Sequence, residues 1–222
     1  MAKMKLLILN CDYDEGADTN GGELIRAHLN RLGINSDILN CFDNQFPSRL
    51  DYSGAIITGS RASVYEKLSW ITKLRTFVKE LDERSIPTLG ICFGFQMIAD
   101  TFGGIVQSSG RYEEGFKLIK VERHDIFNSL PRDFFVYESH GDVAVELPQG
   151  AKLLSSNWCN EAFQLRNFFC VQFHPEITMP VAQKMALRDG KEVFSPEKIS
   201  EKYSATLRVI ENFVENFCEF RL

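Results

Sequence analysis

Three side chains in two short motifs have the types and spacing of a nucleophile, its base and an orienting acid. Cys92 lies in residues 90–96, GICFGFQ, where an apolar run ends and a helix-forming run begins. His174 ends the apolar run of residues 171–176, VQFHPE, and Glu176 follows it two residues later. A cysteine nucleophile needs a base to take and return its proton, and that base needs a third group to fix its tautomer. The two motifs therefore predict covalent catalysis by Cys92, His174 and Glu176.

The glycines on either side of Cys92 predict a strained connection from a strand to a helix. Without a Cβ atom, Gly90 and Gly94 let the strand and the helix approach closely around the turn. This is the pattern of a nucleophile elbow, with sulfur in place of oxygen. The helix N-terminus would lie beside the sulfur, where its unpaired N–H groups favour the thiolate.

The elements that must position these residues alternate between strand and helix. Apolar runs predict strands at residues 5–10, 35–39, 53–59, 86–92 and 168–173, and helical spacing predicts helices at 23–32, 70–81 and 93–102. Such alternation is typical of a three-layer α/β sandwich with a central, mostly parallel sheet. Because ligands bind beyond the carboxyl ends of parallel strands, we expect Asp12, Gly59 and Cys92 to converge on one cleft.

Short, turn-separated strands follow Gly103 and predict a small antiparallel hairpin region. We expect them at residues 105–107, 116–121, 134–137, 143–145, 152–154 and 161–165, with a turn at 166–167 before the last strand. The polar residues 111–114 would form a loop that either roofs the cleft or is an exposed hairpin tip. Helices are predicted at 179–190 and 204–220, with an N-cap at 195–197. We interpret residues 1–222 as one domain with a C-terminal helical extension from about 178 to 222.

Composition narrows the classes of function. The chain has 222 residues and a net charge of −5, which gives nucleic-acid binding no electrostatic support. No run of 18 apolar residues occurs, so no membrane span is expected. Six scattered cysteines without a C-x-x-C pair predict reduced thiols in a cytoplasmic protein. Asp12 and Asp14 have the chemistry of metal ligands, but acids on a strand-end loop are usually solvated, so we expect neither a metal nor a cofactor.

Four motifs together resemble the class I (triad) glutamine amidotransferases. Residues 90–96 and 173–176 are similar to the two signatures of that family. Residues 138–142, ESHGD, resemble the Ser-His-Gly-Asp stretch in the amidotransferase part of GMP synthase. Residues 58–64, TGSRASV, stand in the place of the family's Gly-Gly-Pro oxyanion loop. The resemblance implies the flavodoxin-like fold of this family, and the C-terminal helices resemble those of stand-alone, GMP-synthase-like members.

The resemblance also implies a role for each motif. Cys92 would attack the γ-amide carbon of glutamine, His174 would act as base and then acid, and Glu176 would orient His174. The N–H groups of Phe93 and of Ser60 or Gly59 would hold the oxyanion. The substrate-binding residues that the resemblance implies are Gly59, Ser60, Phe93, Gln96, Ser139, His140 and Gly141.

Two departures from the family pattern affect the expected function. The family's Gly-Gly-Pro is Gly59-Ser60-Arg61 here. Backbone N–H groups survive this change, and Arg61 would either bind a substrate carboxylate or remain a solvated loop residue. The Ser-Gly-Gly-x-Asp-Ser phosphate loop of the GMP synthase pyrophosphatase domain has no counterpart in this sequence. Ammonia would therefore pass to an acceptor on a separate synthetase subunit.

Three hypotheses remain open from the sequence. The favoured one is a glutaminase that hands ammonia to a partner enzyme. The second is a stand-alone hydrolase of γ-glutamyl amides or peptides. The third is a non-catalytic regulatory module on the same fold, since a fold does not determine a function. The intact set of Cys92, His174 and Glu176 argues against the third hypothesis, while the first two differ in whether a partner is needed.

Overall fold

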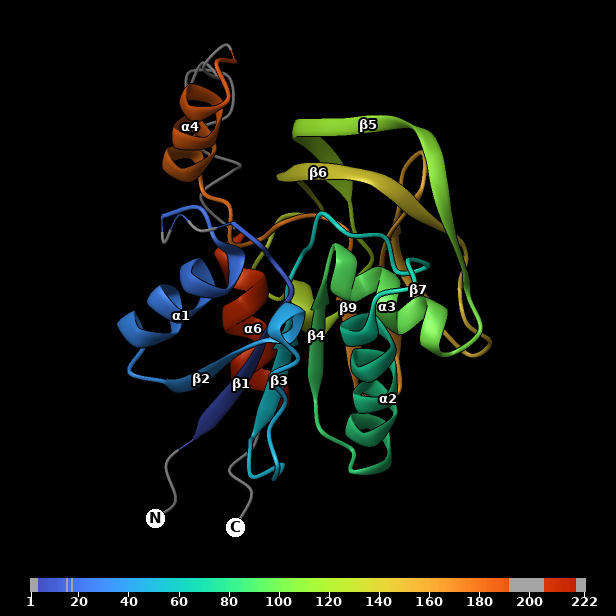
Figure 1. Cartoon of the computed structure of the whole chain (residues 1–222). Coiled ribbons are helices and arrows are strands. Elements are labelled where there is room, and N and C mark those ends of the chain that lie inside the picture. The colour runs from blue at the N-terminus through green and yellow to red at the C-terminus, as the bar shows by residue number, and fades with distance from the viewer. Residues whose placement is uncertain (1–3, 15, 17, 192–205, 219–222) are drawn as a thin grey trace.

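The computed structural model describes residues 4–14, 16, 18–191 and 206–218 of the chain (Figure 1). The main sheet contains β1 (Lys5–Asn10), β2 (Asn35–Asn40), β3 (Gly54–Ile57), β4 (Thr88–Ile91), β7 (Lys152–Ser156), β8 (Asn160–Leu165) and β9 (Phe168–Val171). The helices are α1 (Gly21–Arg31), α2 (Ser69–Glu83), α3 (Phe93–Thr101), α4 (Met179–Arg188) and α6 (Leu207–Phe217), with short 3₁₀ turns η1 (Cys41–Asp43) and η2 (Asp125–Phe127).

The strand order in this sheet is β2-β1-β3-β4-β9-β8-β7. The five strands from β2 to β9 are parallel, whereas β8 and β7 run antiparallel at one edge. The turn predicted at residues 166–167 joins β8 to β9, and Arg166 takes a positive φ of 52° there. The prediction of a central, mostly parallel sheet is confirmed.

Alternate side chains of the buried strands enter two different cores, which makes the three layers. In β1, Leu6 and Ile8 pack with residues of α1 and α6, whereas Leu7 and Leu9 pack with residues of α2 and α3. This division follows from the period-2 alternation of a strand that is covered on both faces. The helix α6 thus contributes directly to a core of the sheet through Val209, Ile210, Phe213 and Val214.

The first helix begins two residues earlier than the sequence predicts. The Gly21 N–H donates to Asp12 Oδ2 at 2.9 Å, and the Glu23 N–H donates to Asn20 Oδ1 at 3.1 Å. These two side chains satisfy N–H groups that a helix leaves unpaired at its start. The expectation of a loop up to Gly22 was wrong because Asn20 is the N-cap and the glycines form the first turn.

A long antiparallel hairpin of β5 (Ile105–Lys120) and β6 (Asp133–Glu146) extends beyond the main sheet (Figure 1). The prediction of four separate strands with a polar loop at 111–114 was therefore wrong. The register shifts between Ser108 and Glu113, and Gly110 has a positive φ of 76°. Because most of the stretch from 105 to 114 is exposed, it lacks the apolar alternation that marks a half-buried strand.

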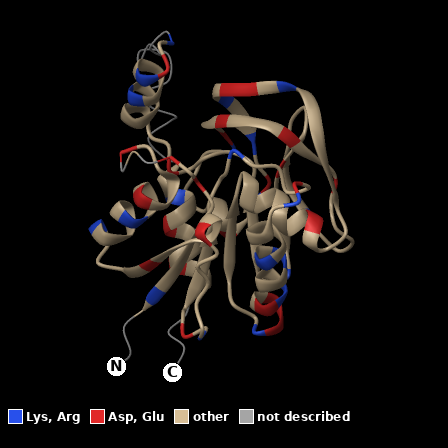
Figure 2. Cartoon of the chain, viewed as in Figure 1, with Lys and Arg blue, Asp and Glu red and all other residues tan. Residues whose placement is uncertain are grey.

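The helices predicted near the C-terminus are present as α4 and α6, within the described residues. The N-cap predicted at 195–197 lies outside the described residues. Figure 2 shows both signs of charge interspersed along α2 and on the hairpin, without a continuous basic face in that view. Among the described helices, none has the length and apolar character that a membrane crossing requires.

Candidate active site

Cys92 occupies a strained backbone turn between β4 and α3. Its φ of 51° and ψ of −102° lie outside the regions that L-residues ordinarily adopt. A Cβ atom on Gly94 would lie 2.4 Å from the Ile57 carbonyl oxygen, and one on Gly90 would lie 2.8 Å from the Gly94 carbonyl carbon. The strand and the helix therefore approach each other closely around Cys92, as predicted from Gly90 and Gly94.

His174 and Glu176 lie directly after β9, the strand that pairs with β4. The pairing sets Ile91 opposite Val171, so the two motifs meet at the same edge of the sheet. His174 Nδ1 donates to Glu176 Oε1 at 2.8 Å, because the carboxylate can only accept. The backbone N–H of His174 donates to the Tyr137 carbonyl at 2.9 Å. These bonds orient the ring and leave the buried Nε2 without a hydrogen bond among the described residues.

The charges around His174 favour its protonated form. Burial alone lowers the pKa of His174, but the negative charges of Glu176 and Cys92 outweigh burial and hold this pKa well above its usual range. Protonated His174 can therefore stabilise the negative charge that develops on Cys92 Sγ when it acts as a nucleophile, in a site where both side chains are largely buried. The two side chains together supply a nucleophile and a proton for a leaving group.

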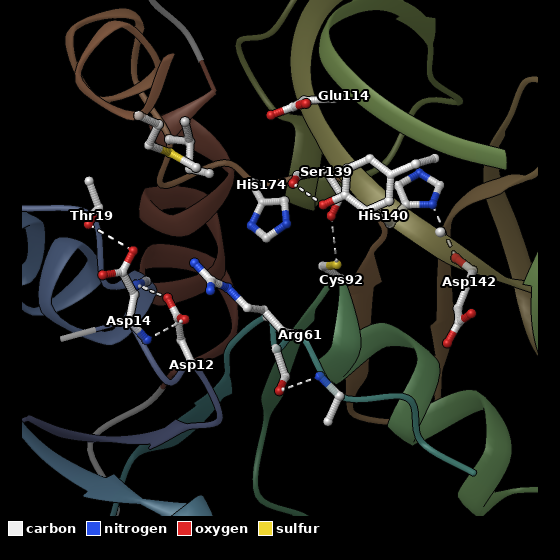
Figure 3. Close-up of a pocket in the computed structure, with 18 of the residues that line it drawn as sticks. Asp12, Asp14, Thr19, Arg61, Cys92, Glu114, Ser139, His140, Asp142 and His174 are labelled. Carbon is white, nitrogen blue, oxygen red and sulfur yellow. Dashed lines mark hydrogen bonds between the residues drawn. The ribbon is translucent and has the colours of Figure 1, made fainter. Parts of the chain in front are cut away.

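A cavity of about 660 Å³ opens over Cys92 (Figure 3). Six of the seven predicted substrate-binding residues line it together with the three predicted catalytic ones: Gly59, Ser60, Gln96, Ser139, His140 and Gly141. The seventh, Phe93, is buried as the first residue of α3, where its N–H belongs to the unpaired helix start beside Cys92. Residues from four separate stretches of the chain are thus brought to one place.

Direct hydrogen bonds tie the β6 segment 139–142 to the elbow. Cys92 Sγ donates to the Ser139 carbonyl at 3.8 Å (Figure 3). Gln96 Nε2 donates to the Asp142 carbonyl at 2.9 Å and to Gln172 Oε1 at 3.3 Å. The amide nitrogen of Gln96 is therefore engaged by the protein itself, and the position of the segment depends on the elbow and on α3.

The rim of the cavity contains residues that the sequence motifs missed. Tyr112 and Glu114 of β5 line the cavity, and the Tyr112 hydroxyl hydrogen-bonds to Ser139 Oγ at 2.8 Å. Lys191, just after α4, donates to Glu114 Oε1 at 2.7 Å. Residues 111–114 thus roof the cleft, which was one of the two alternatives. No local motif marks Lys191, because its place depends on how α4 meets the hairpin.

The acidic pair near the N-terminus organises the loop at the cavity edge. Asp14 Oδ1 and Oδ2 accept from the Gly16 N–H and the Thr19 hydroxyl at 2.9 Å each, and Asp14 also pairs with Arg188 of α4. Burial raises the pKa of Asp12, whose carboxylate accepts from the Gly21 N–H. Both aspartates therefore have partners within the protein, and both line the cavity.

Gly59 is the position at which the smallest change should disturb the catalytic geometry. A Cβ atom on Gly59 would lie 2.7 Å from His174 Cε1. We expect Gly59→Ala to displace the imidazole and to lower kcat/KM by about 10²-fold, since a shift of about 1 Å in a catalytic group has that effect. Steady-state kinetics checks this prediction, with Gly33→Ala in an open loop as the control for a glycine change elsewhere. Equal activity of Gly59→Ala and the parent would contradict the geometry.

Comparison with known proteins agrees with this architecture. The family model of class-I glutamine amidotransferases matches residues 19–192. GMP synthase [glutamine-hydrolyzing] of Aromatoleum aromaticum is 34% identical over 193 residues, which cover 80% of this chain and 35% of that protein. A Macrococcus caseolyticus protein of the same name is 32% identical over 185 residues. The chain spans about a third of the length of these curated relatives.

A solved structure shares the fold over the whole chain. A glutamine amidotransferase from Thermotoga maritima superposes with a TM-score of 0.81 at 20% identity, covering 99% of this chain and 100% of that one. The fold and the site define a three-layer α/β protein with a cysteine at a nucleophile elbow. With the family match over most of its length, the chain belongs to the class-I glutamine amidotransferases.

Proposed function

We propose that this chain hydrolyses the side-chain amide of glutamine to glutamate and ammonia. One observation carries the proposal: His174 Nδ1 is fixed by Glu176 at 2.8 Å, so that Nε2 is left for Cys92 at the strained elbow. The negative charges of Glu176 and Cys92 outweigh the effect of burial and favour protonated His174, which prepares the pair for nucleophilic attack. The family membership makes glutamine the first substrate to test.

In the first half-reaction, Cys92 Sγ attacks the γ-amide carbon and forms a carbon–sulfur bond. The oxyanion accepts hydrogen bonds from the Phe93 N–H at the start of α3 and from the N–H of Ser60 or Gly59. The carbon–nitrogen bond then breaks, and the nitrogen takes a proton from His174 and leaves as ammonia. The enzyme is left as a γ-glutamyl thioester.

In the second half-reaction, water replaces ammonia at the same position. His174 Nε2 takes a proton from the water as its oxygen attacks the thioester carbon. The carbon–sulfur bond breaks, glutamate leaves and the proton on His174 balances the thiolate of Cys92. The net reaction consumes one water for each glutamine, and Glu176 holds the imidazole throughout.

The ammonia would be used by an acceptor bound to another protein. The curated relatives are named GMP synthase [glutamine-hydrolyzing], and this chain corresponds to about a third of their length. The sequence printed here contains no phosphate-binding loop of the type that such a synthetase uses to activate a nucleotide. We propose as the partner a synthetase that activates the acceptor of the ammonia.

The test is to measure glutamate and ammonia released from glutamine by the purified chain, with and without cell extract. A glutaminase that serves a partner should be slow alone and accelerated by extract. A stand-alone hydrolase should turn over some γ-glutamyl compound at ordinary rates without extract. Absence of amide hydrolysis under every condition would favour the non-catalytic module and refute the proposal.

The size of the cavity and the place of Arg61 favour a second candidate, hydrolysis of a larger γ-glutamyl amide. Pockets of roughly 300–1,000 Å³ hold drug-sized ligands, and the cavity here, at about 660 Å³, exceeds the needs of glutamine. Figure 3 shows Arg61 extending into it. Arg61 makes no hydrogen bond or salt bridge with any residue that the structure describes, although its charge acts on Asp189. A leaving amine that carries an acidic group would complement this guanidinium.

This candidate predicts a change of specificity in Arg61→Gln. The variant should lose about tenfold in kcat/KM for a γ-glutamyl amide with a carboxylate on its leaving amine, since a charge-assisted hydrogen bond contributes about 1.5–3 kcal/mol. Its kcat/KM for glutamine should stay within about twofold, because free glutamine places no group there. Competition assays with both substrates measure the ratio directly. A parallel loss for both substrates would assign Arg61 to glutamine binding instead.

A further inference from the structure

A buried cluster of titratable side chains lies behind the substrate-facing segment of β6, and the mechanism above does not use it. Glu138 and His140 project from β6, and Glu161 projects from β8. Their exposed fractions are 1%, 4% and 1%. Buried carboxyl groups are costly unless they are paired, hydrogen-bonded or protonated. The protonation state of these buried side chains therefore has to be derived from their contacts.

The contacts of the cluster form a chain that ends at the active site. Cys159 Sγ donates to Glu161 Oε1 at 3.3 Å. The side chains of Glu161 and Glu138 lie within hydrogen-bonding reach of each other. Glu138 Oε2 is 3.0 Å from His140 Nε2, and His140 Nδ1 is 3.1 Å from the Asp142 carbonyl oxygen. The contact between Glu161 and Glu138 joins β8 to β6, whereas the two contacts of His140 lie within β6.

The direction of the protons follows from the donor and acceptor types. The Asp142 carbonyl can only accept, so His140 Nδ1 must carry a hydrogen. In neutral His140, Nε2 is then an acceptor, and Glu138 must donate to it. Two carboxyl groups share a hydrogen bond only if one of them is protonated, which makes Glu161 the donor to Glu138. When Glu161, Glu138 and His140 are all neutral, each of these contacts has one donor and one acceptor.

Ionisation of both carboxyl groups would leave no donor between Glu161 and Glu138, or between Glu138 and the neutral ring of His140. Both oxygens of Glu138, Oε2 of Glu161 and Nε2 of His140 have no hydrogen-bond partner among the described residues. Burial raises the pKa of Glu138 to about 7. Burial and the neighbouring Glu138 raise the pKa of Glu161 to about 8. Burial lowers the pKa of His140, which favours the neutral ring.

The end of the chain is shared with the nucleophile elbow. The Asp142 carbonyl that accepts from His140 Nδ1 also accepts from Gln96 Nε2 at 2.9 Å. The same segment includes the Ser139 carbonyl that accepts from Cys92 Sγ. The ring of His140 stacks on Trp158 with centroids 5.7 Å apart and 7° between the planes. The rotation of His140, and with it the place of residues 139–142, therefore depends on the proton held by Glu138.

We propose that Glu161, Glu138 and His140 form a proton-sharing chain that positions β6 residues 139–142 for substrate, and that loss of its protons at alkaline pH weakens substrate binding. Glu138 and Glu161 are positioning residues in this proposal and touch no reacting atom. The inference rests on the proposed glutamine hydrolysis for its kinetic effect, whereas the proton chain itself is a property of the folded protein.

Other titratable groups surround Glu138 and Glu161, whose pKa values are about 7 and about 8. They come from β5, from the turn before β8, from β6 and from the segment after β9: Arg111, Glu113, Lys117, Cys159, His140 and His174. The Lys117 ammonium holds the pKa of Glu113 below its usual range. Burial raises the pKa of the Cys159 thiol. The pKa of His140 is lowered and that of His174 is raised well above its usual range. The two buried glutamates are therefore the groups that we expect to titrate between pH 7 and pH 8.

The decisive variants are Glu138→Gln, Glu161→Gln and the double variant. A glutamine at 138 donates its amide to His140 Nε2 and accepts from residue 161, which reproduces the protonated acid without a titrating proton. Activity at pH 6 should stay within about fivefold of the parent, as expected for exchange of neutral hydrogen bonds. In the double variant, the alkaline limb of kcat/KM should move up by about one pH unit, chiefly through KM. Glu146→Gln, an exposed carboxylate on the same strand, is the matched control and should leave the limb in place.

A second measurement does not depend on catalysis. A carboxyl group whose folded pKa is raised stabilises the fold fully below its unfolded pKa of about 4.5, and this contribution is lost as pH rises through the folded pKa. The melting temperature of the parent should therefore fall relative to that of the double variant between pH 5 and pH 8, by about 5 °C. A pH-independent difference, or a double variant less stable at every pH, would overturn the proton chain.

The two readouts separate the two proposals. If the parent hydrolyses no amide but shows the expected pH-dependent melting difference, the proton-sharing chain is supported and the proposed function is refuted. If the parent is an active glutaminase and the double variant keeps the same alkaline limb, the positioning role fails and the proposed function stands. The single variants decide the matter by the same criteria if the double variant does not fold.

Discussion

Replacement of Cys92 by alanine should abolish amide hydrolysis while the fold stays intact. Loss of the nucleophile in an enzyme with a catalytic triad costs about 10⁶-fold in kcat. Alanine occupies less space than cysteine at this buried position, and it meets the same strain at a φ of 51°. Ammonia release should therefore fall to background, whereas circular dichroism and the melting temperature should stay close to those of the parent.

Labelling provides the control for this prediction. A glutamine-mimicking diazo-ketone should modify Cys92 and none of the other five cysteines, as peptide mass analysis would show. Burial raises the pKa of Cys11, Cys170 and Cys218, which keeps them as unreactive thiols. Retained activity in Cys92→Ala, or labelling of another cysteine with Cys92 untouched, would contradict the elbow as the site of the covalent step.

Replacement of Glu176 by glutamine should cost about 10⁴-fold in kcat, as in other triads whose orienting acid is made an amide. The glutamine side chain has nearly the same shape, but its amide can donate to Nδ1 and stabilise the wrong tautomer of His174. Nε2 would then carry the hydrogen and could not take a proton from Cys92 or from water. Stopped assays of glutamate formation over a long time course would measure the residual rate.

The same variant should change the pH dependence in a defined direction. Burial is the largest influence on the pKa of His174 and lowers it. The negative charge of Glu176 is the next largest influence and raises this pKa. Without the carboxylate this pKa should fall, so the alkaline limb of kcat/KM should move to lower pH. A raised histidine pKa also stabilises the fold below the unfolded pKa of about 6.5, and that contribution is lost as pH rises through the folded value. Glu122→Gln, an exposed carboxylate paired with Arg132, should change neither property.

Much of the fold was predictable because its signals are local. The strands β1, β3, β4 and β9 are mostly apolar runs, and the stripe of α2 from Trp70 to Leu81 repeats at helical spacing. The hairpin of β5 and β6 was not predicted as two long strands. Its outer part is exposed on both sides, so pairing between distant residues holds it together, and pairing of that kind leaves no periodic pattern.

The start of α1 shows the same limit at a smaller scale. Two glycines at the first helical positions predict a loop on propensity alone. The structure places them in the helix because Asp12, nine residues before Gly21, accepts from its N–H. A contact between separate segments thus outweighed a local preference.

By itself, the sequence determined which residues are the candidates for the chemistry. Two glycines around a cysteine require a tight turn, and a histidine with a carboxylate two residues later supplies the base and its orienting group. These requirements are local, so residues 90–96 and 171–176 are enough to predict them. The family resemblance and the prediction of Cys92, His174 and Glu176 as the catalytic residues follow from these two motifs.

Only the tertiary structure decided the surroundings that set the strength of this chemistry. The pairing of β4 with β9 brings the two motifs together. The charges of Glu176 and Cys92 outweigh burial and favour the protonated form of His174. The cluster of Glu138, His140 and Glu161 exists because β6 crosses behind the cavity against β8, a contact between residues more than 20 positions apart. Protonation depends on desolvation and on neighbouring charges, and both are properties of the packed chain that no short motif contains.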